Sequence, residues 1–482
     1  MPINQLYLSK FHYLLILFCF IFLFSCTKPQ TGLNGIWESV APDGKEKFII
    51  ELEQKEGVDI VGYITIPYRG RSKIKLKEIS LSNDSLFLSH DDFNFEFAGV
   101  VQNDNLIGFP NKKNTVSKFA RIDIFEKRPQ TPIGSKNYYD EDVYFLNSVD
   151  KIILGGTLSV PKDDNQAPAI ILITGSGQQD RDETIFYHRP FQILADYLAK
   201  QGIAVLRIDD RGVGASGGRA YGQTSEDYAQ DILSAISFLK KDERIDPQNI
   251  GLFGHSEGGI IALLAADQNT TVPYIITYGS PYVTGKELAL SQLNTYFRSV
   301  SNDEKTIENV LLLYSQIFDT LIATGLANGG KETIEQSFYK WLNTNRNNEE
   351  ALSFIGFTSE RIDDNKAREN FLKTAVSPYL HPWMIYILRY SPQNLIEKTE
   401  TQILAVFGEK DQQVISSKNT AQIEALNNIY VNQIEMRTIK DANHFMQTSN
   451  TGSITEVYDL EETISQQILE TIGSWVKNYS KN

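Results

Sequence analysis

The sequence predicts two domains of different class, an all-β domain followed by an α/β domain built on a mostly parallel sheet. Two patterns support this prediction. From residue 30 to about 128, apolar and polar residues alternate with period two, and no helical segment interrupts them. From residue 169 onward, apolar strands alternate with helical segments, which requires a sheet covered by helices on both faces. A length of 482 residues is ample for two or three domains.

The first domain is expected to be a small antiparallel barrel or sandwich. Its alternating segments are 46–52, 60–66, 85–89, 93–97 and 118–124. The opening Gly35-Ile36-Trp37 and the spaced glycines that follow resemble a lipocalin-like barrel. Such a barrel either binds a ligand or spaces the second domain from a membrane, and we favour the spacer interpretation.

A linker is expected at 129–142, where Pro129 and Pro132 stand among few apolar residues. A β-hairpin then leads into the second domain. The later strands are expected at 169–173, 204–208, 250–253, 274–278 and 403–407, with helices at 191–200, 225–241 and 258–267.

Residues 283–399 interrupt this alternation. Segments 307–322 and 334–342 have helical periodicity, and no strand is evident before residue 403. An independent helical domain is the alternative, but the resumed sheet favours a helical cap inserted over an active site. The expected organisation is a signal peptide at 1–25, a β-domain at 26–128, the linker at 129–142, an α/β domain at 143–282 and 400–482, and the cap at 283–399.

The residues Gly254-His255-Ser256-Glu257-Gly258 lie between an apolar strand and an apolar helix. A strand, a sharp turn with serine at its apex, and a helix are the context of a nucleophile elbow. The flanking glycines let strand and helix approach closely, and the serine takes a strained backbone conformation. An ordinary glycine-rich turn is the alternative. We expect Ser256 to be a nucleophile.

A serine nucleophile needs a base, and the chain has six histidines. His444 follows a predicted strand at 434–439, so it would lie at the carboxyl edge of the sheet, where the elbow also opens. His381 belongs to the helical insertion and is expected to pack there or to line the substrate site. The other four lie in the signal peptide, in the β-domain, before a strand or beside the serine: His12, His90, His188 and His255. We therefore expect His444 to be the general base.

The acid that orients this base is expected to be Asp411. Asp411 follows the strand at 403–407, again at a carboxyl edge of the sheet. Glu409 is too close to the strand end, and Asp441 is too local to His444 to reach beneath its ring. A helix-capping carboxylate is the alternative interpretation of Asp411.

Two backbone N–H groups should stabilise an oxyanion. One is expected from Glu257, the residue after the nucleophile. The other is expected from the turn after the strand at 169–173, where the candidates are Gly175, Ser176, Gly177 and Gln178. A phosphate-cradling loop is the alternative, but no Lys-Ser pair follows this turn. The charged residues 180–183 either latch the turn through an ion pair or contact substrate, and we favour the latch.

These segments together resemble α/β-hydrolases across roughly residues 140 to 480. The resemblance is greatest to bacterial carboxylesterases with a glycine-rich Ser-Gly-x-x-x-Arg-Asp segment, here within 175–183. The turn at 209–216 matches the family's Asp-x-Arg-Gly-x-Gly-x-Ser motif. The loops at Asp411 and His444 match its acid and base loops, in the order serine, acid, histidine. One departure is Thr174, where many members have histidine, and it affects the geometry of the oxyanion loop.

The resemblance implies a serine hydrolase that cleaves carboxylic acyl esters through an acyl-enzyme, with no metal ion and no organic cofactor. A serine peptidase or aminopeptidase acting on small peptides shares this fold and triad, but the apolar cap favours esters. A non-catalytic binding lipoprotein is a third alternative. A hydrolase domain that has lost its activity usually lacks a triad residue, however, and all three are present here. The formal charge of −14 and the absence of basic blocks argue against nucleic acid as a partner.

The N-terminus predicts attachment to a membrane. Lys10 precedes the apolar run 11–24, which is too short and too terminal for a spanning helix. The run ends in Leu-Phe-Ser-Cys26, which resembles a bacterial lipobox whose cysteine becomes lipid-modified; a plain secretory signal or membrane anchor is the alternative. The other cysteine, Cys19, lies in the removed segment, so the mature chain has no thiol for a disulfide, a zinc site or catalysis. We expect a bacterial cell-envelope lipoprotein anchored through Cys26.

Overall fold

The computed structural model describes residues 33–40, 47–54, 60–66, 71–82, 85–90, 95–102, 104–110, 116–122, 128–133, 137–162, 166–269, 271–325, 330–397, 399–430 and 434–479. The chain divides into two compact units, one within residues 1–123 and the other made mainly of 124–482. The expected signal peptide and Cys26 lie outside the described residues. Within the described ranges, no helix combines the length and the apolar character needed to span a membrane.

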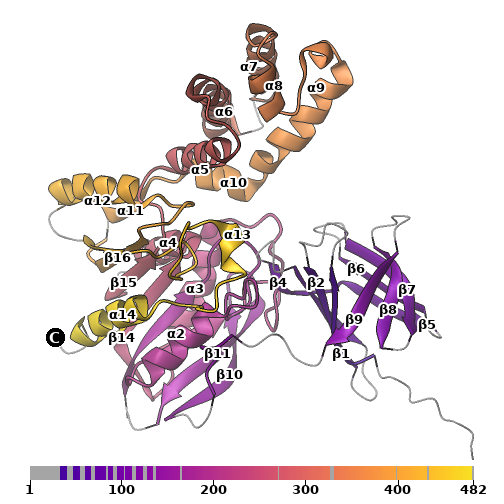
Figure 1. Cartoon of the computed structure of the whole chain (residues 1–482). Helices are drawn as coiled ribbons and strands as arrows, with labels where there is room; N and C mark the ends of the chain where they lie inside the picture. The colour runs from indigo at the N-terminus through magenta and orange to yellow at the C-terminus, as the bar shows by residue number, and fades with distance from the viewer. Residues whose placement is uncertain are drawn as a thin grey trace, which may run out of the picture. The chain divides into compact units, whose positions relative to one another are not determined.

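The N-terminal part of the chain forms one antiparallel sheet in the order β4-β3-β2-β1-β9-β8-β7-β6-β5 (Figure 1). Its strands are β1 (Gly35–Val40), β2 (Lys47–Glu53), β3 (Val61–Ile66), β4 (Arg71–Lys75), β5 (Glu78–Ser82), β6 (Ser85–His90), β7 (Phe95–Gln102), β8 (Asn105–Pro110) and β9 (Ser117–Ile122). The alternating pattern buries one face, where Phe97 and Phe119 pack edge to face with ring centroids 5.3 Å apart. The predicted all-β domain is confirmed, and its single sheet fits the barrel alternative better than the sandwich.

The second unit contains an eight-stranded sheet in the order β10-β11-β13-β12-β14-β15-β16-β17. Its strands are β10 (Tyr138–Asn147), β11 (Ile152–Pro161), β12 (Ala167–Ile173), β13 (Ala204–Ile208), β14 (Ile245–His255), β15 (Tyr274–Tyr278), β16 (Gln402–Gly408) and β17 (Ile434–Ile439). Strand β11 is antiparallel to both neighbours, and the pairs from β13 to β17 are all parallel. The predicted α/β class is therefore confirmed.

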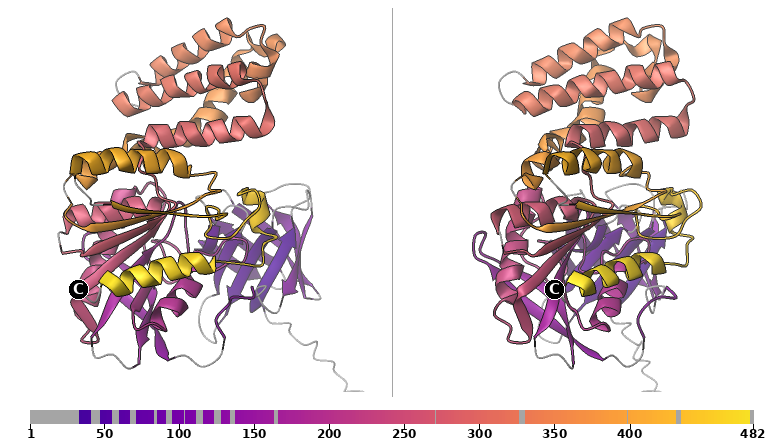
Figure 2. Two further views of the ribbon diagram at one scale, coloured as in Figure 1. Left: turned by 60° about the vertical axis from the view of Figure 1, so that its left-hand side comes forward. Right: turned by 90° about the vertical axis from the view of Figure 1, so that its left-hand side faces the viewer.

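Helices cover both faces of this sheet (Figures 1 and 2). On one face lie α3 (Ser225–Leu239), α4 (Glu257–Gln268) and α12 (Ser416–Tyr430), and on the other lie α2 (Pro190–Ala199) and α14 (Gln466–Tyr479). Successive side chains of β12 divide between the two cores: Ile171 packs with α3 and α4, whereas Ile170 and Leu172 pack with α2 and α14. Burial on both faces explains why the sequence of β12 is apolar without alternation.

Strand β10 begins inside the segment that the sequence predicted as a linker at 129–142, so that boundary is wrong. Tyr138 is buried, and its hydroxyl donates to Asp196 Oδ1 on α2 at 2.8 Å. The charged residues 140–142 are typical of a loop, but hydrogen bonds and ion pairs with other segments stabilise them within the sheet. Ser159 Oγ donates to Asp140 Oδ1 at 2.5 Å, for example. Such pairing lets a polar stretch form a strand that its composition does not favour.

Between β15 and β16 the chain forms a helical insertion with its own apolar core. Its helices are α5 (Gly285–Val300), α6 (Glu304–Thr324), α7 (Gly330–Thr344), α8 (Glu349–Phe354), α9 (Asn365–Phe371), α10 (Pro382–Arg389) and α11 (Pro392–Ile396), with short 3₁₀ or π turns at 359–361, 372–376 and 377–380. A capping box starts α5, because Thr284 and Glu287 each bond the other's backbone N–H. After β17, α13 (Ile454–Val457) precedes α14.

Candidate active site

Ser256 stands alone between strand β14 and helix α4. Its φ of 53° and ψ of −118° lie in a region that non-glycine residues rarely occupy. The Ser256 N–H donates to the carbonyl of Tyr278 at the end of β15, at 2.9 Å, so the neighbouring strand holds the turn in place. The structure therefore has the strand, sharp turn and helix that the sequence predicts around this serine.

The two glycines that flank the serine allow a very close backbone approach. A Cβ atom on Gly254 would lie 2.3 Å from the carbonyl group of Gly258. A Cβ atom on Gly258 would lie 2.2 Å from the carbonyl oxygen of Ile173, the last residue of β12. Any larger residue at either position would push helix α4 away from the sheet, and the turn would open.

His444 and Asp411 meet at the same end of the sheet, in the loops after β17 and β16. His444 Nδ1 is 2.7 Å from Asp411 Oδ2, and both residues are buried. Asp411 Oδ1 accepts hydrogen bonds from the N–H groups of Gln413 and Val414, each at 2.8 Å, which orient the carboxylate. Because an ionised carboxylate only accepts, Nδ1 carries the hydrogen, and Nε2 of a neutral ring is left as the basic nitrogen.

The rival acids and the other downstream histidine are engaged elsewhere. Glu409 Oε2 accepts from the Asp441 N–H at 3.0 Å, and Asp441 pairs with Lys410 at 2.7 Å. His381 caps the N-terminus of α10, where its Nδ1 accepts from the Trp383 N–H at 3.3 Å. The structure thus brings together the three residues selected from the sequence and places their rivals in local structural contacts.

The loop after β12 narrows the choice among the predicted oxyanion donors. The Gly175 N–H donates to Glu183 Oε1 at 2.7 Å, so it is already occupied and that candidate is wrong in this conformation. Gly177 and Gln178 are not among the residues that line the cavity at Ser256, whereas Ser176 is. In the described part of the chain, the Ser176 N–H has no hydrogen-bond partner.

The departure at Thr174 has a structural explanation. Its hydroxyl donates to Asp210 Oδ1 at 2.8 Å, and the Gln179 N–H donates to Asp210 Oδ2 at 2.9 Å. Burial raises the pKa of Asp210 well above its usual range, although these two hydrogen bonds oppose the effect. Next to it, Asp209 forms a two-point ion pair with Arg181. The turn after β13 therefore fixes both ends of the oxyanion loop.

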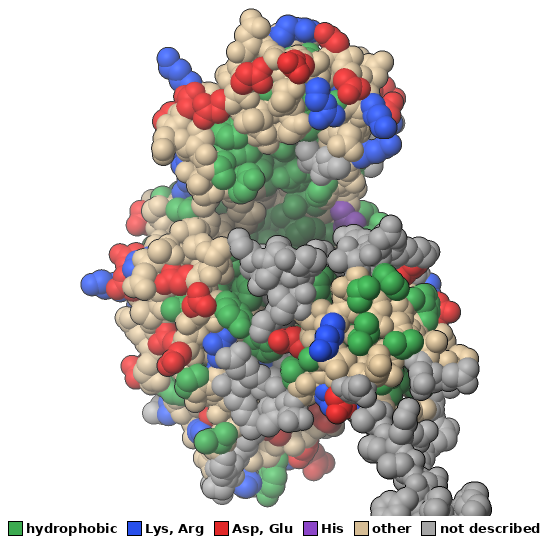
Figure 3. Space-filling view, turned by 45° about the vertical axis from the view of Figure 1, so that its right-hand side comes forward, with side chains coloured by type: hydrophobic (Ala, Val, Ile, Leu, Met, Phe, Trp, Pro, Cys, Tyr) green, Lys and Arg blue, Asp and Glu red, His purple; other side chains and the backbone are tan. Residues whose placement is uncertain are grey.

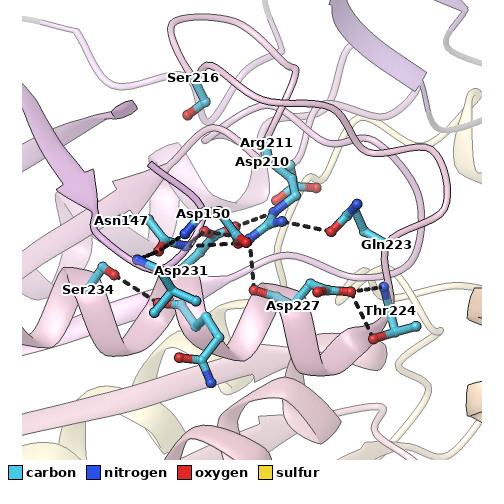
Figure 4. A network of polar contacts seen from close by, with 12 residues as sticks. Asn147, Asp150, Asp210, Arg211, Ser216, Gln223, Thr224, Asp227, Asp231 and Ser234 are labelled. Carbon is cyan, nitrogen blue, oxygen red and sulfur yellow. Dashed lines mark hydrogen bonds and ion pairs between the residues drawn. The ribbon is translucent and has the colours of Figure 1, made fainter. Parts of the chain in front are cut away.

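This turn is itself anchored by a buried polar network (Figure 4). Arg211 donates through Nε and Nη2 to the two carboxylate oxygens of Asp231 on α3, each at 2.8 Å. Its remaining donors reach Asp150 and Gln223, both at 2.9 Å. Asn147 Nδ2 completes the Asp231 site at 2.7 Å. The bidentate geometry suits a buried arginine, because the planar guanidinium and the carboxylate form two parallel hydrogen bonds and neutralise each other's charge.

The charged residues 180–183 all make internal contacts, in agreement with the latch interpretation. Besides the Arg181 pair, Asp182 forms an ion pair with Arg207, and Glu183 Oε1 lies 2.8 Å from His255 Nδ1. Asp180 Oδ1 accepts from the N–H groups of Asp182 and Thr184.

A cavity of about 370 Å³ opens at Ser256, and His444 and Ser176 also line it. Its opposite wall comes from α5 and α10 of the insertion, including Leu288 and Trp383. Figure 3 shows hydrophobic side chains gathered in the hollow beneath the insertion. None of the described residues that line the cavity is Lys or Arg. The site therefore suits an apolar group without negative charge.

The side chain of Glu257 links the insertion to the core. Its Oε1 accepts from Ser225 Oγ on α3 at 2.6 Å and from Trp383 Nε1 on α10 at 2.7 Å. Burial raises the pKa of this carboxyl group, although its hydrogen bonds lower it. Sequence reasoning identified only the backbone N–H of Glu257 and missed Trp383. An acidic residue next to the serine, at the start of a mainly apolar helix, is the signal that could have pointed to a buried partner.

Comparisons with known proteins agree with this fold. Residues 187–304 match a family model described as serine aminopeptidase, S33. Esterase EstD of Thermotoga maritima is 28% identical over 191 residues, which are 39% of this chain and 45% of that protein. Protein phosphatase methylesterase 1 of Bos taurus is 25% identical over 189 residues, 38% of this chain and 46% of that protein. The chain thus spans less than half the length of these curated relatives.

Among solved structures, an esterase of Pyrococcus furiosus aligns with a TM-score of 0.41 at 16% identity, covering 74% of this chain and 98% of that one. An α/β hydrolase from Penicillium aligns with a TM-score of 0.42 at 16% identity, covering 71% and 100%. The second unit thus has a mostly parallel sheet with a strained serine turn after β14, and its sequence is similar to that of an esterase and to a serine aminopeptidase family model.

Proposed function

We propose that the chain is a serine hydrolase that cleaves carboxylic acyl esters through Ser256, His444 and Asp411. The observation that carries the proposal is the buried 2.7 Å pair between His444 and Asp411, which shares one cavity with the strained Ser256. Such a pair holds an imidazole in the tautomer that accepts a proton from a serine.

In the proposed reaction, Ser256 Oγ attacks the acyl carbonyl carbon while His444 Nε2 takes the hydroxyl proton. The carbonyl electrons move to oxygen, and the N–H groups of Glu257 and Ser176 would stabilise that oxyanion. When the intermediate collapses, the alcohol leaves with the proton from Nε2. A water molecule, deprotonated by the same nitrogen, then hydrolyses the acyl-enzyme and restores the serine.

The cavity lining supports an acyl ester as substrate. Its wall on the insertion side is apolar, and the two carboxylates among its described lining residues, Glu183 and Glu257, each accept hydrogen bonds from other protein groups through Oε1. A free peptide amino terminus would need a carboxylate left open for its ammonium group.

A serine aminopeptidase is the second candidate, since the matching family model carries that description and Glu183 Oε2 has no partner among the described residues. Rates on p-nitrophenyl acyl esters of rising chain length should exceed those on aminoacyl p-nitroanilides. Faster cleavage of the anilides would favour the aminopeptidase.

A fluorophosphonate probe tests the nucleophile without knowledge of the substrate. The wild-type chain should be labelled, and Ser256→Ala should abolish both labelling and ester hydrolysis with an unchanged melting temperature. Ser234→Ala is the matched control: its hydroxyl donates to the Gln230 carbonyl within α3 and does not line the cavity, so this variant should be labelled like the wild type. Undiminished hydrolysis by Ser256→Ala would overturn the proposal.

We also propose that Cys26 carries a lipid anchor to a bacterial envelope membrane, on the support of the lipobox-like sequence alone. Cys26→Ala should move the chain from the membrane fraction to the soluble fraction and should prevent incorporation of a labelled fatty acid. A chain that still incorporates the fatty acid would contradict the anchor.

A further inference from the structure

The histidine before the nucleophile is buried between three parts of the site. His255 is 5% exposed. Its Nδ1 lies 2.8 Å from Glu183 Oε1, and its Nε2 lies 2.8 Å from the backbone carbonyl oxygen of His444. A carbonyl oxygen and an ionised carboxylate can only accept hydrogen bonds, so both ring nitrogens must carry hydrogen. The geometry of its partners therefore favours the imidazolium form of His255.

The surroundings of the ring favour this charge. Burial by itself lowers the pKa of His255, but the charge and hydrogen bond of Glu183 and the bond to the His444 carbonyl outweigh it, and the pKa is raised. Asp411, from the loop after β16, adds a further favourable charge. The other titratable groups that face the ring are the His444 imidazole, with centroids 4.9 Å apart, and Tyr278 on β15, at 6.1 Å.

The contacts of this ion pair form a chain across the site. Glu183 Oε1 accepts from the Gly175 N–H at 2.7 Å, next to the Ser176 N–H that would face the oxyanion. His255 is bonded to the next residue, Ser256, and it holds the carbonyl of the base, His444. The loop after β12, the elbow and the loop after β17 are therefore joined through one carboxylate and one imidazolium.

Another buried histidine in the same unit shows that burial alone does not produce this arrangement. His188 is 2% exposed, and its ring nitrogens face the Thr463 hydroxyl at 2.8 Å and the Val457 carbonyl at 3.0 Å. A hydroxyl can donate to one ring nitrogen while the carbonyl accepts from the other, which suits a neutral ring. The raised pKa of His255 therefore comes from its specific partners.

We propose that Glu183 and His255 are positioning residues for the reaction, which hold the oxyanion loop and the base loop in register with Ser256. The proposal rests on the proposed function. Because these loops contribute to the transition state more than to substrate binding, the pair acts on kcat and leaves KM nearly unchanged.

The test uses the full chain with His255→Gln, Glu183→Gln and the double variant. Each single variant should lower kcat about 10- to 100-fold, with KM within about twofold of the wild type, since a displacement near 1 Å costs about 10²-fold. The double variant should be no worse than the poorer single variant, because each change removes the same ion pair between Glu183 and His255. Fluorophosphonate labelling should slow by the same factors.

Asp196→Asn is the matched control for lost stability, since Asp196 on α2 binds Tyr138 and Lys200 and does not line the cavity. It should lower the melting temperature and keep kcat. Should His255→Gln fail to fold, Glu183→Gln decides, because a glutamine oxygen still accepts from the Gly175 N–H and only the charge is lost.

A kcat within twofold of the wild type in the folded variants, or losses that multiply in the double variant, would overturn the inference. Its failure is distinguishable from failure of the proposed function. If the wild type is active, Ser256→Ala is inactive and His255→Gln is unaffected, only the positioning role is refuted. If the wild type neither hydrolyses esters nor reacts with the probe, the proposed function itself is refuted.

Discussion

Replacing His188 with glutamine should make the folded chain less sensitive to acid between pH 7 and pH 4. Burial, and then the positive charge of Arg128, lower the pKa of His188 from 6.5 to about 4. The unfolded chain therefore binds a proton at this ring below pH 6.5, whereas the folded chain does so only near pH 4. The stability that the neutral ring contributes is present above pH 6.5 and is lost as the pH falls toward 4.

The size of the effect follows from the two pKa values. The difference between 6.5 and about 4 corresponds to about 3 kcal/mol of unfolding free energy across this pH window. Urea unfolding of the wild type and of His188→Gln at several pH values from 4 to 8 measures it. Taking the difference between the two proteins cancels the carboxylates that titrate in the same range.

Thr463→Val is the control, because it removes a hydrogen bond to the ring but keeps the histidine. It should lower stability at every pH and retain the wild-type slope. If the wild type and His188→Gln lose equal stability between pH 7 and pH 4, the reasoning is refuted. The His188 ring would then take up its proton at the same pH in the folded and the unfolded chain.

The remaining predictions concern the site and its supports. Asp411→Asn should lower kcat by about four orders of magnitude because the wrong tautomer of His444 is favoured, whereas Asp441→Asn should stay within twofold; equal losses in ester assays would contradict the choice of acid. Gly258→Ala should destabilise the fold by at least about 1–3 kcal/mol, since the new Cβ would lie 2.2 Å from a carbonyl oxygen. An unchanged melting temperature in thermal unfolding would contradict this prediction. Trp383→Phe removes a hydrogen bond to Glu257, so KM for acyl esters should rise severalfold while labelling by a small fluorophosphonate stays within twofold; slower labelling would mean that Trp383 supports the nucleophile as well. The stability advantage of the wild type over His255→Gln should be full below pH 6.5 and should disappear as the pH rises above that value, because the pKa of His255 is raised in the folded state; a constant advantage up to pH 9 in urea titrations would show that the ring is neutral.

Sequence reasoning located Ser256, Asp411 and His444 because each follows an apolar strand of one parallel sheet. Parallel strands bring their carboxyl ends to the same edge, so a residue just beyond a strand has a predictable place in space. The insertion was recognisable for a related reason. A helical segment between two strands of one sheet must leave the sheet, and the chain must then return to it for the next strand. Register and periodicity carry this much information without any side-chain contact.

The oxyanion loop shows where such reasoning stops. Four residues between Gly175 and Gln178 were equivalent as candidates, because composition does not reveal which N–H group is already bonded. The Gly175 N–H is occupied by Glu183, a residue eight positions away that a turn folds back onto the loop. The start of β10 was misplaced for a similar reason, since its carboxylates find partners on the next strand, at Ser159, and far along the chain, at Arg244.

The two buried histidines of the second unit differ in the same way, through contacts that are distant in the sequence. Both belong to one unit, both are almost inaccessible to water, and burial alone would make each ring neutral. His188 faces a hydroxyl and a carbonyl, and its pKa is lowered, whereas His255 faces a carboxylate from a residue 72 positions away and a carbonyl 189 positions away, and its pKa is raised. The charge of a buried histidine therefore follows from the tertiary contacts of its two nitrogens. At His255 those contacts are the loops that the proposed reaction needs, so its protonation state and the geometry at Ser256 should change together.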